Sequence, residues 1–343
     1  MGLRDQIVRG DSRELADRFA AVGAALFAGD PHPAAPAAAR TLALLDRAHP
    51  TRRRCEVELV VADGPDARGR VAAIVNPRLT EDGAPVGLVG LFACEDRPDV
   101  ARWLIDAACS WLDRRGCKVV RGPVLFSTWH DYRFLTRAEA PEWIPGEPYH
   151  PAYYPALFEA AGFRPVATYS SNWLGDSSEQ ADRFAPKAAR SREAGYRVRP
   201  LEPRDVDALY QVATAAFASA WMYSPIERDE FAALYTPEQA ARVAPFSFLG
   251  LAPDGEPIGF MYDFPLAIAG RQASVCKTVA VHPAHRSSGI YHAMMHAWFA
   301  GQRAAGIRHA IGGLMHNDGS PSLMGWATPE TLLKEYKVYE LRL

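Results

Sequence analysis

The sequence lacks the features that mark secreted, membrane-spanning or disulfide-stabilised proteins. Its five cysteines are scattered over 343 residues and form no Cys-x-x-Cys pair. Such a set predicts reduced, mostly buried thiols and argues against a disulfide framework or a zinc knuckle. No uninterrupted apolar run approaches the roughly 20 residues that cross a bilayer, and the N-terminus has no signal-peptide core. We therefore expect a cytoplasmic protein that does not associate with membranes.

An excess of charge of one sign is also missing. The chain has 38 Lys and Arg residues against 40 Asp and Glu, which leaves a net charge of −2. Bulk attraction to nucleic acid is therefore not expected. A hydrophobic content of 48% is typical of a globular protein, and the length suggests about two domains.

One stretch, Cys276–Gly306, shows the pattern of a strand, a polar turn and a helix. The strand pattern runs to Val281 and breaks at Pro283, after which apolar residues recur at helical spacing. Gly306 stands where a glycine ends a helix, and the apolar run 307–314 then predicts a second strand. The expected order is strand, helix, glycine, strand.

The polar turn of this stretch has the chemistry of a phosphate site. Several backbone N–H groups at the start of a helix lack partners, and the helix dipole is positive there. Ser287 and Ser288 add hydroxyl donors, and Arg286 adds a guanidinium suited to phosphate oxygens. Gly289 would let the backbone approach the ligand closely.

This turn resembles the pyrophosphate loop of the GNAT superfamily of acyl-CoA-dependent N-acyltransferases, written V-x-P-x-x-[RQ]-x-x-G-x-[GA]. Val281, Pro283, Arg286 and Gly289 match the motif, whereas Tyr291 replaces its last small residue. The resemblance implies that the chain binds acetyl-CoA or another acyl-CoA. The residues it assigns to that ligand are Val279, Ala280, Val281, Arg286, Ser287, Ser288, Gly289, Ile290, Tyr291 and Asn317. A strand, turn and core helix without a ligand is the alternative.

Transfer of an acyl group to an amine needs a neutral amine, a polarised thioester carbonyl and a protonated leaving thiol. Asp263 and His316 are the candidate bases by residue type and placement. The resemblance implies a tyrosine acid seven residues after Asn317, but Met324 stands there, so Tyr336 becomes the candidate acid. Positioning alone could also suffice without a dedicated base.

A metal site is not expected. Two histidines, His292 and His296, stand four residues apart on the predicted helix, which is metal-ligand spacing. The residues between them are Ala-Met-Met, and no third ligand is evident. We interpret both as helix-surface or packed histidines.

The same order of elements occurs twice. Three alternating segments, 56–62, 69–76 and 86–94, predict antiparallel strands, and a strongly amphipathic helix, a glycine and a strand follow. We therefore predict an α/β (α+β) fold of two tandem GNAT-like domains, each a mixed, mostly antiparallel sheet flanked by helices. The predicted division is a first domain at 1–174, a polar linker at 175–195 with room for a short helix, and a second domain at 196–343.

The first copy differs at the turn that would hold the phosphates. It reads Cys94-Glu95-Asp96-Arg97-Pro98, with carboxylates and no glycine. A carboxylate about 4 Å from a phosphate costs about 4 kcal/mol at an effective dielectric constant of about 20. Residues 50–170 also resemble an uncharacterised bacterial GNAT-like family, through strings such as Arg121-Gly122-Pro123 and Pro151–Pro155. We expect a degenerate copy that holds no CoA.

Three functions remain open. The preferred one is transfer of an acetyl or other acyl group from CoA to the amine of a small molecule by the second domain. A donor carried by an acyl carrier protein or by aminoacyl-tRNA is an alternative for the same fold, although the latter needs a basic groove that the charge does not favour. A non-catalytic CoA-binding or scaffold protein is the third. The acceptor, the acyl chain and the oligomeric state are not specified by the sequence.

Overall fold

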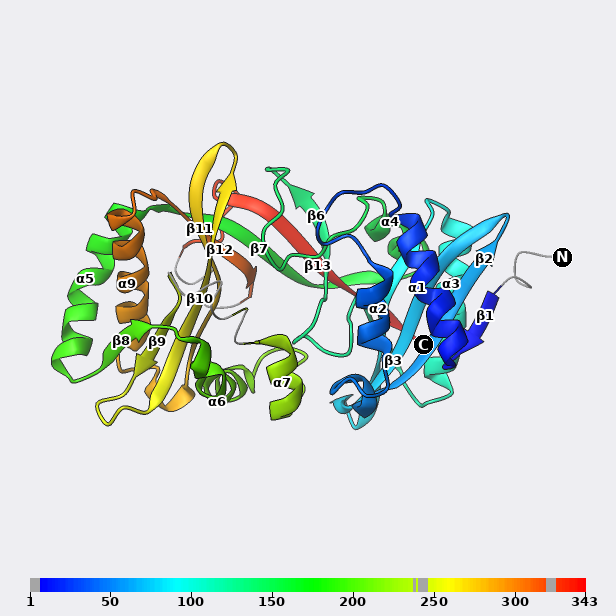
Figure 1. The fold of residues 1–343 in the computed structure, drawn as a ribbon, viewed down its shortest axis with the longest axis horizontal. Coiled ribbons are helices and arrows are strands. Elements are labelled where there is room, and N and C mark those ends of the chain that lie inside the picture. Colours follow the sequence, from blue (N-terminus) through cyan, green and yellow to red (C-terminus); the bar gives the residue numbers. More distant parts are fainter. Residues whose placement is uncertain (1–6, 237–238, 240–245, 319–324) are drawn as a thin grey trace. The chain divides into compact units, whose positions relative to one another are not determined.

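The computed structural model describes residues 7–236, 239, 246–318 and 325–343 (Figure 1). The chain divides into two compact units, each made of several segments. Unit 1 comprises residues up to Thr136 together with Pro148–Thr168 and Tyr336–Leu343, and unit 2 comprises Arg137–Glu147 and Tyr169–Glu335. Each unit is described separately below.

The sheet of unit 1 has the strand order β1-β2-β3-β4-β5-β13. All neighbours are antiparallel except β4 and β5, which are parallel where Val86–Leu88 pair with Val119–Arg121. Its elements are β1 (Ile7–Gly10), α1 (Arg13–Leu26), α2 (Ala38–Leu45), β2 (Glu56–Gly64), β3 (Ala67–Glu81), β4 (Ala84–Cys94), α3 (Pro98–Asp113), β5 (Val119–Gly122), β6 (Phe134–Ala138), α4 (Tyr154–Ala160), the first part of β7 (Arg164–Asp176) and the end of β13 (Leu332–Arg342).

Local sequence signals predicted most of unit 1. The Ser12 hydroxyl accepts from the Leu15 N–H at 3.2 Å and caps α1, which is the role that a serine directly before a helix favours. The three predicted antiparallel strands are β2, β3 and β4, and α3 buries its apolar face in the core through residues such as Val100, Leu104 and Trp111. Hydrophobic periodicity therefore identified these elements correctly.

The sheet of unit 2 has the strand order β7-β12-β11-β10-β9-β8. Here too one pair, β11 and β12, is parallel, and the other pairs are antiparallel. Its elements are the end of β7, α5 (Ser177–Glu193), β8 (Arg197–Pro200), α6 (Val206–Phe217), α7 (Arg228–Leu234), β9 (Phe248–Leu251), β10 (Pro257–Ile268), β11 (Arg271–Val281), α9 (Ile290–Ala304), β12 (His309–His316) and the start of β13. One parallel pair around one helix thus recurs in both units, as the repeated order of elements predicted.

The boundaries between the units differ from the predicted division. The last strand, β13, pairs antiparallel with β5, from Tyr339 opposite Gly122 to Arg342 opposite Val119. The C-terminal residues therefore belong to unit 1, whereas the segment Arg137–Glu147 belongs to unit 2. Pairing between residues more than 200 positions apart leaves no local signal in the sequence.

The predicted linker at 175–195 is instead helix α5. Asp176 caps it by accepting from the Ser178 N–H at 2.8 Å, and Ala181, Phe184 and Ala188 form its buried stripe. Phe184 lies against Phe299 of α9, with ring centroids 5.7 Å apart. Polar composition and Pro186 obscured the helix, because only this narrow apolar stripe contacts the core.

Two bulk features can be read from the described residues. All five cysteines are buried, and none of them takes part in a disulfide there. Within the described ranges, no helix has both the length and the hydropathy needed to cross a bilayer.

Candidate functional site

Strands β11 and β12 separate in the middle of unit 2. They pair in parallel from Ala273 opposite His309 to Cys276 opposite Gly312, and the pairing ends there, although β11 continues to Val281 and β12 to His316. Lys277 is the extra residue of a β-bulge, because its neighbours Cys276 and Thr278 pair with consecutive residues of β10. A bulge bends its strand, so it accounts for the departure of β11 from its partner.

Side chains from β7 hold the separated half of β12. The Leu314 N–H donates to the Ser171 hydroxyl at 3.0 Å, and Leu314 has a left-handed φ of 56°. The Ser170 hydroxyl donates to Asn317 Oδ1 at 2.8 Å. One serine thus binds a backbone group of β12, and the other binds the side chain of the residue that follows this strand. The sequence analysis missed them, and the only signal is the polar run Ser170-Ser171-Asn172 inside an otherwise strand-like segment.

The separation leaves one edge of β11 open. The His282 N–H donates to the Ile258 carbonyl at 2.7 Å, on the β10 side. Alternation in an antiparallel ladder then directs the N–H groups of Val279 and Val281 to the opposite edge, which β12 has left. This is the backbone edge that the sequence analysis assigned to the ligand. Ala280 itself is buried, with its side chain in the core.

The start of α9 lies directly after this open edge. Arg286 and Ser287 are exposed, and Gly289 is the N-terminal cap residue. Ser288 donates its N–H to the His285 carbonyl, and its hydroxyl accepts from the Ile290 N–H at 3.2 Å. Among the described residues, the N–H groups of Ser287 and Gly289 meet no acceptor, and the guanidinium of Arg286 has no ion-pair or hydrogen-bond partner, although its backbone N–H donates to the Pro283 carbonyl. These donors and the positive helix end fit an anion.

Gly289 serves a purpose that the sequence analysis did not foresee. Its φ of 79° favours glycine, and a Cβ at this position would lie 3.2 Å from Ser191 Cβ and 3.6 Å from the Lys187 carbonyl oxygen of α5. The open side of the glycine therefore faces a neighbouring helix. A role for Gly289 at the ligand stays a prediction.

Tyr291 and Ile290 also pack inward. Tyr291 lies edge-on to Phe184 of α5 at 6.3 Å between ring centroids, and burial raises its pKa. Ile290 is fully buried. Tyr291 thus fills the contact with α5, which explains why it stands where the motif has a small residue. Roles for both side chains at the ligand stay predictions.

The candidate base Asp263 lies inside the core. It is fully buried on β10, where Ser274 Oγ donates to its carboxylate at 2.6 Å and Trp298 Nε1 donates at 2.8 Å. Its own N–H donates to Ser247 Oγ at 3.0 Å. Burial raises the pKa of Asp263 to about 7, although the hydrogen bonds from Ser274 and Trp298 oppose this rise. The described surroundings are those of a carboxyl group that links β10, β11 and α9.

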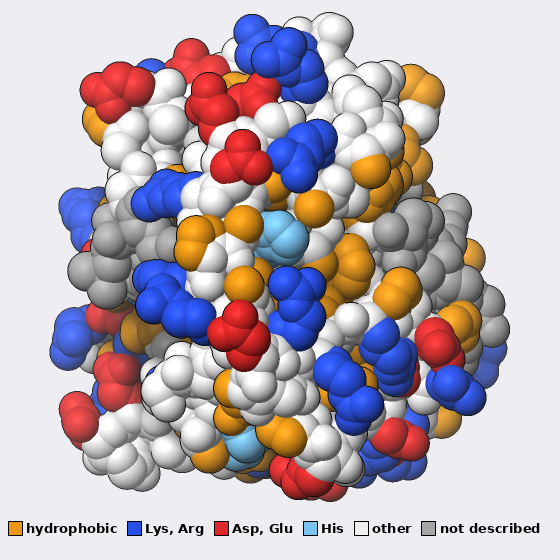
Figure 2. Space-filling view, turned by 90° about the vertical axis from the view of Figure 1, so that its left-hand side faces the viewer, with side chains coloured by type: hydrophobic (Ala, Val, Ile, Leu, Met, Phe, Trp, Pro, Cys, Tyr) orange, Lys and Arg blue, Asp and Glu red, His pale blue; other side chains and the backbone are white. Residues whose placement is uncertain are grey.

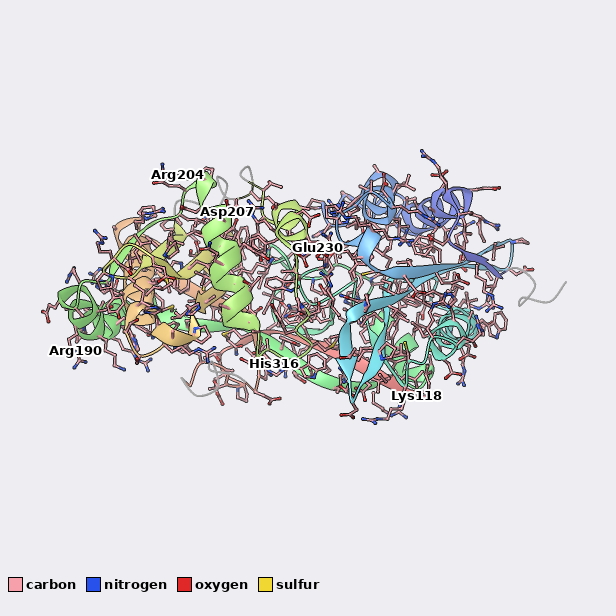
Figure 3. The ribbon with its side chains drawn as sticks, turned by 90° about the horizontal axis from the view of Figure 1, so that it is seen from below. Lys118, Arg190, Arg204, Asp207, Glu230 and His316 are labelled. Atoms are coloured by element: carbon pink, nitrogen blue, oxygen red, sulfur yellow. The ribbon has the colours of Figure 1, made fainter. Side chains whose placement is uncertain are left out.

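His316 and Tyr336 lie in different units. His316 is half-buried at the end of β12, beyond the separation, and lies edge-on to Tyr169 at 4.8 Å (Figure 3). Tyr336 is fully buried and belongs to unit 1, whereas the loop and the open strand edge belong to unit 2. Within unit 2, His316 ends the separated half of β12, whereas Asp263 lies in the core. Met324, where the usual tyrosine is missing, lies outside the described residues.

The two helix histidines do not form a metal site within the described residues, where no group of three potential ligands occurs. His292 Nε2 lies 3.3 Å from Lys187 Nζ. Burial and the positive charges of Lys187 and Arg190 lower the pKa of His292. Cationic side chains of α5 thus lie beside the start of α9.

Unit 1 closes the equivalent place with tyrosines. At the end of β4, the Cys94 N–H donates to the Tyr154 hydroxyl at 3.2 Å, and the Tyr153 hydroxyl donates to the Cys94 carbonyl at 2.8 Å. Both tyrosines come from the start of α4. A ligand that paired with this strand end would have to displace them.

Comparison with known proteins bears on the fold. No family model matches the chain. A curated relative from Caulobacter vibrioides, named a bacterial ceramide synthase, is 29% identical over 228 residues, which cover 62% of this chain and 58% of the relative. The alignment thus spans little more than half the length of that relative.

Solved structures resemble the whole chain. A tandem GNAT protein from the clavulanic acid biosynthesis pathway covers 98% of both chains with a TM-score of 0.51 and 14% identity. A probable N-acyltransferase from Enterococcus faecalis V583 has a TM-score of 0.56 and 11% identity, with coverage of 98% of this chain and 72% of that one. A GCN5-related N-acetyltransferase from Kribbella flavida has a TM-score of 0.54 and 14% identity, with coverage of 98% and 71%. The chain therefore has the GNAT fold, in two tandem domains.

Proposed function

We propose that unit 2 transfers an acyl group from an acyl-CoA to an amine. The observation that carries this proposal is the open edge of β11 next to the unpartnered donors at the start of α9. An extended chain with amide groups, such as the pantetheine arm, can hydrogen-bond to an open strand edge. The start of α9, where this strand edge ends, suits the negative charge of a pyrophosphate.

The chain offers a separate group for each part of the donor. Arg286 and the N–H groups of Ser287 and Gly289 would hold the pyrophosphate. Val279 and Val281 would bind the pantetheine arm through their N–H groups, and Asn317 would contact it from the β12 side. Ala280 would contribute only through the backbone of this strand, since its side chain is buried.

Helix α5 supports the proposal electrostatically. Lys187 and Arg190 are exposed on α5, which packs beside the start of α9 (Figures 1 and 3). Figure 2 shows the face that carries both helices, with Lys and Arg side chains distributed over it and acidic side chains among them. Local positive potential attracts a phosphate-bearing donor and raises its rate of association.

The chemistry needs few protein groups. Bound acyl-CoA would supply a thioester whose carbonyl carbon forms the new bond to the amine nitrogen while the C–S bond breaks. The N–H groups of the open strand edge would orient and polarise the carbonyl oxygen. His316 would accept the proton of the amine, and that proton finally resides on the departing thiol. Because the proton of the amine ends on the thiol, the reaction requires no separate acid. The proposal therefore gives Tyr336 no role.

The curated relative suggests which substrates to include. It is named a ceramide synthase, and ceramides are amides of fatty acids with long-chain amines. Long-chain acyl donors and long-chain amines therefore belong in the assay beside acetyl-CoA and small amines. A donor bound to an acyl carrier protein presents the same pantetheine arm and is the second donor to compare.

Thermal-shift titration with CoA, acetyl-CoA and palmitoyl-CoA tests the binding step. A ligand at about 100 times its dissociation constant stabilises by about 2.7 kcal/mol, which raises the midpoint by several degrees. We expect Arg286→Glu to weaken CoA binding by about tenfold or more. The matched control is Arg204→Glu, at an exposed arginine of the same unit that pairs with Glu202 (Figure 3). Equal CoA binding by both variants would contradict the assignment of the loop.

Release of free thiol in the presence of amines tests the transfer step. We expect His316→Ala to lower kcat by about a hundredfold or more while CoA binding persists. His309→Ala, on the paired part of the same strand, is the control. Binding of CoA without thiol release for any amine would favour a non-catalytic CoA-binding protein.

A further inference from the structure

Unit 1 contains a cavity of about 420 Å³ with an unusual concentration of arginines. Arg47, Arg52, Arg53 and Arg115 line it, together with three carboxylates. The lining comes from the ends of α2 and α3, the turn at Arg52–Arg54 and the first residues of β2. The sequence analysis gave this arginine run no function.

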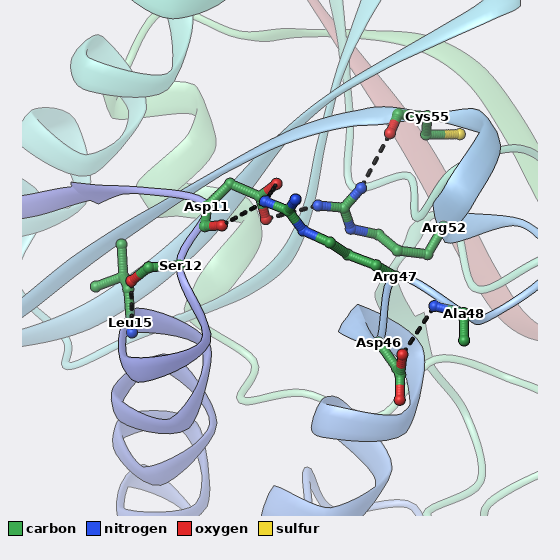
Figure 4. Close-up of polar contacts among 8 residues, drawn as sticks. All are labelled: Asp11, Ser12, Leu15, Asp46, Arg47, Ala48, Arg52 and Cys55. Carbon is green, nitrogen blue, oxygen red and sulfur yellow. Dashed lines mark hydrogen bonds and ion pairs between the residues drawn. The ribbon is translucent and has the colours of Figure 1, made fainter.

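Arg52 forms a fixed part of the cavity wall (Figure 4). Its side chain is only 6% exposed, and it donates to Asp11 Oδ1 at 2.6 Å and to the Cys55 carbonyl at 3.0 Å. Asp11 also accepts from Arg47 at 2.7 Å, so one carboxylate serves two guanidinium groups. The buried Nε of Arg52 has no hydrogen-bond partner. Burying a guanidinium is costly, and an apolar residue could fill the same space.

Arg115 is held in a fixed orientation on another part of the wall. Its guanidinium lies 3.5 Å from the centroid of the Trp111 ring, and its Nε donates to Glu56 at 2.8 Å. Within the described part of the chain, its two Nη atoms have no acceptor. Stacking and one ion pair thus orient a planar fork whose remaining donors are available to a ligand.

The balance of charge favours an anion. Four arginines against three carboxylates leave one positive charge in excess, and Arg47 is 73% exposed at the rim. The guanidinium groups lie on separate parts of the cavity wall. They can therefore donate to different oxygens of one ligand, provided that each oxygen can accept two hydrogen bonds. A phosphate or pyrophosphate group has this geometry, and the cavity volume is that of a small-molecule site.

This cavity is separate from the place in unit 1 that corresponds to the CoA loop. That place is at the amino end of α3, which begins at Pro98, whereas Trp111 and Arg115 lie at its carboxyl end. Thirteen residues of helix separate Pro98 from Trp111, about 20 Å at 1.5 Å per residue. Loss of the loop in the first copy therefore does not affect the cavity.

We propose that unit 1 binds a compact phosphate-bearing small molecule in this cavity, with Arg47 and Arg115 as the groups that contact it. Arg52 holds Asp11 in place and forms the part of the cavity wall behind Arg47 and Arg115. The first domain is then a binding module of its own, in addition to its degenerate GNAT-like fold. The proposal is independent of acyl transfer by unit 2.

Isothermal titration of the full chain with inorganic pyrophosphate tests the proposal. The Arg286→Glu background is used, because pyrophosphate can also bind at the start of α9. We expect saturable binding in this background, and a dissociation constant at least about tenfold higher when Arg47→Gln and Arg115→Gln are added. Arg102→Gln is the control, since this exposed arginine of α3 pairs with Asp106 and does not line the cavity.

Two results would overturn the proposal. One is the absence of pyrophosphate binding in the Arg286→Glu background. The other is equal binding by the Arg47/Arg115 double variant and the Arg102 control. Circular dichroism and the unfolding midpoint establish that the double variant is folded. If it is not, Arg47→Gln alone provides the same comparison, because this rim side chain is largely exposed.

Discussion

Replacement of Asp263 by asparagine should remove a pH dependence of stability that the wild-type protein carries. The carboxyl group is fully buried and receives hydrogen bonds from Ser274 and Trp298. Asparagine has nearly the same shape, and its amide can donate to Ser274 while its oxygen accepts from Trp298. The substitution therefore removes the titration and keeps the packing.

The sign follows from the direction of the pKa shift. Burial raises the pKa of Asp263 from 3.8 to about 7, so the folded protein keeps the proton over a range in which the unfolded chain releases it. The stabilisation is complete below the unfolded pKa and is lost as the pH rises through that range to about 7. At 1.36 kcal/mol per pH unit, the full loss is of the order of 4 kcal/mol, and about 3 kcal/mol of it falls between pH 5 and pH 8.

Urea unfolding at pH 5 and pH 8, followed by tryptophan fluorescence, measures this loss. We expect the free energy of unfolding to fall by about 3 kcal/mol more in wild type than in Asp263→Asn between the two pH values. Asp207→Asn is the control, since this carboxylate is 72% exposed and its loss should leave the pH dependence as in wild type (Figure 3). Parallel pH profiles for wild type and Asp263→Asn would refute the reasoning, and a wild type that gains stability toward pH 8 would reverse its sign.

Three further predictions concern packing and the assignment of roles. Gly289→Ala should lower the unfolding midpoint more than Gly306→Ala, because both glycines have positive φ but only Gly289 faces another helix within 4 Å; equal effects would contradict the close contact with α5. Lys334→Met should lower the free energy of unfolding in urea by about 3–5 kcal/mol, because it removes the ammonium group 2.6 Å from the buried carboxylate of Glu147. Glu147→Gln in the same chain should restore much of the loss. Tyr336→Phe should leave the rate of thiol release unchanged, since its side chain is fully buried in unit 1; a large fall in kcat would restore Tyr336 as an acid.

The fold could be predicted from the sequence wherever the signal is local. The alternation in Glu56–Gly64, the amphipathic pattern of Pro98–Asp113 and the glycine at 306 each identified an element correctly. For 175–195 the sequence allowed only a short helix within a linker, because the exposed face of α5 is polar and only one residue in three or four contacts the core. The placement of β13 beside β5 was missed because strand pairing between distant segments depends on the whole fold.

The site residues stay predictions, and the structure shows what surrounds them. The motif points to Arg286, whose side chain is exposed and has no partner among the described residues. It also assigns Gly289 to the ligand, and the structure adds that this glycine packs closely against α5. Nothing in the motif indicated that Ser170 and Ser171 bind the end of β12, because their contribution depends on a strand far away in sequence.

The two units show how one arrangement of strands can be open in one copy and closed in the other. Both have a parallel strand pair that ends early, so both expose backbone groups at the end of the preceding strand. In unit 1, Tyr153 and Tyr154 satisfy these groups at Cys94. In unit 2, serines of β7 bind the departing strand instead, and the edge of β11 stays available. An unsatisfied strand edge is costly unless water or a ligand pairs with it, so retention of the open edge in one copy is an argument that this copy binds its ligand there.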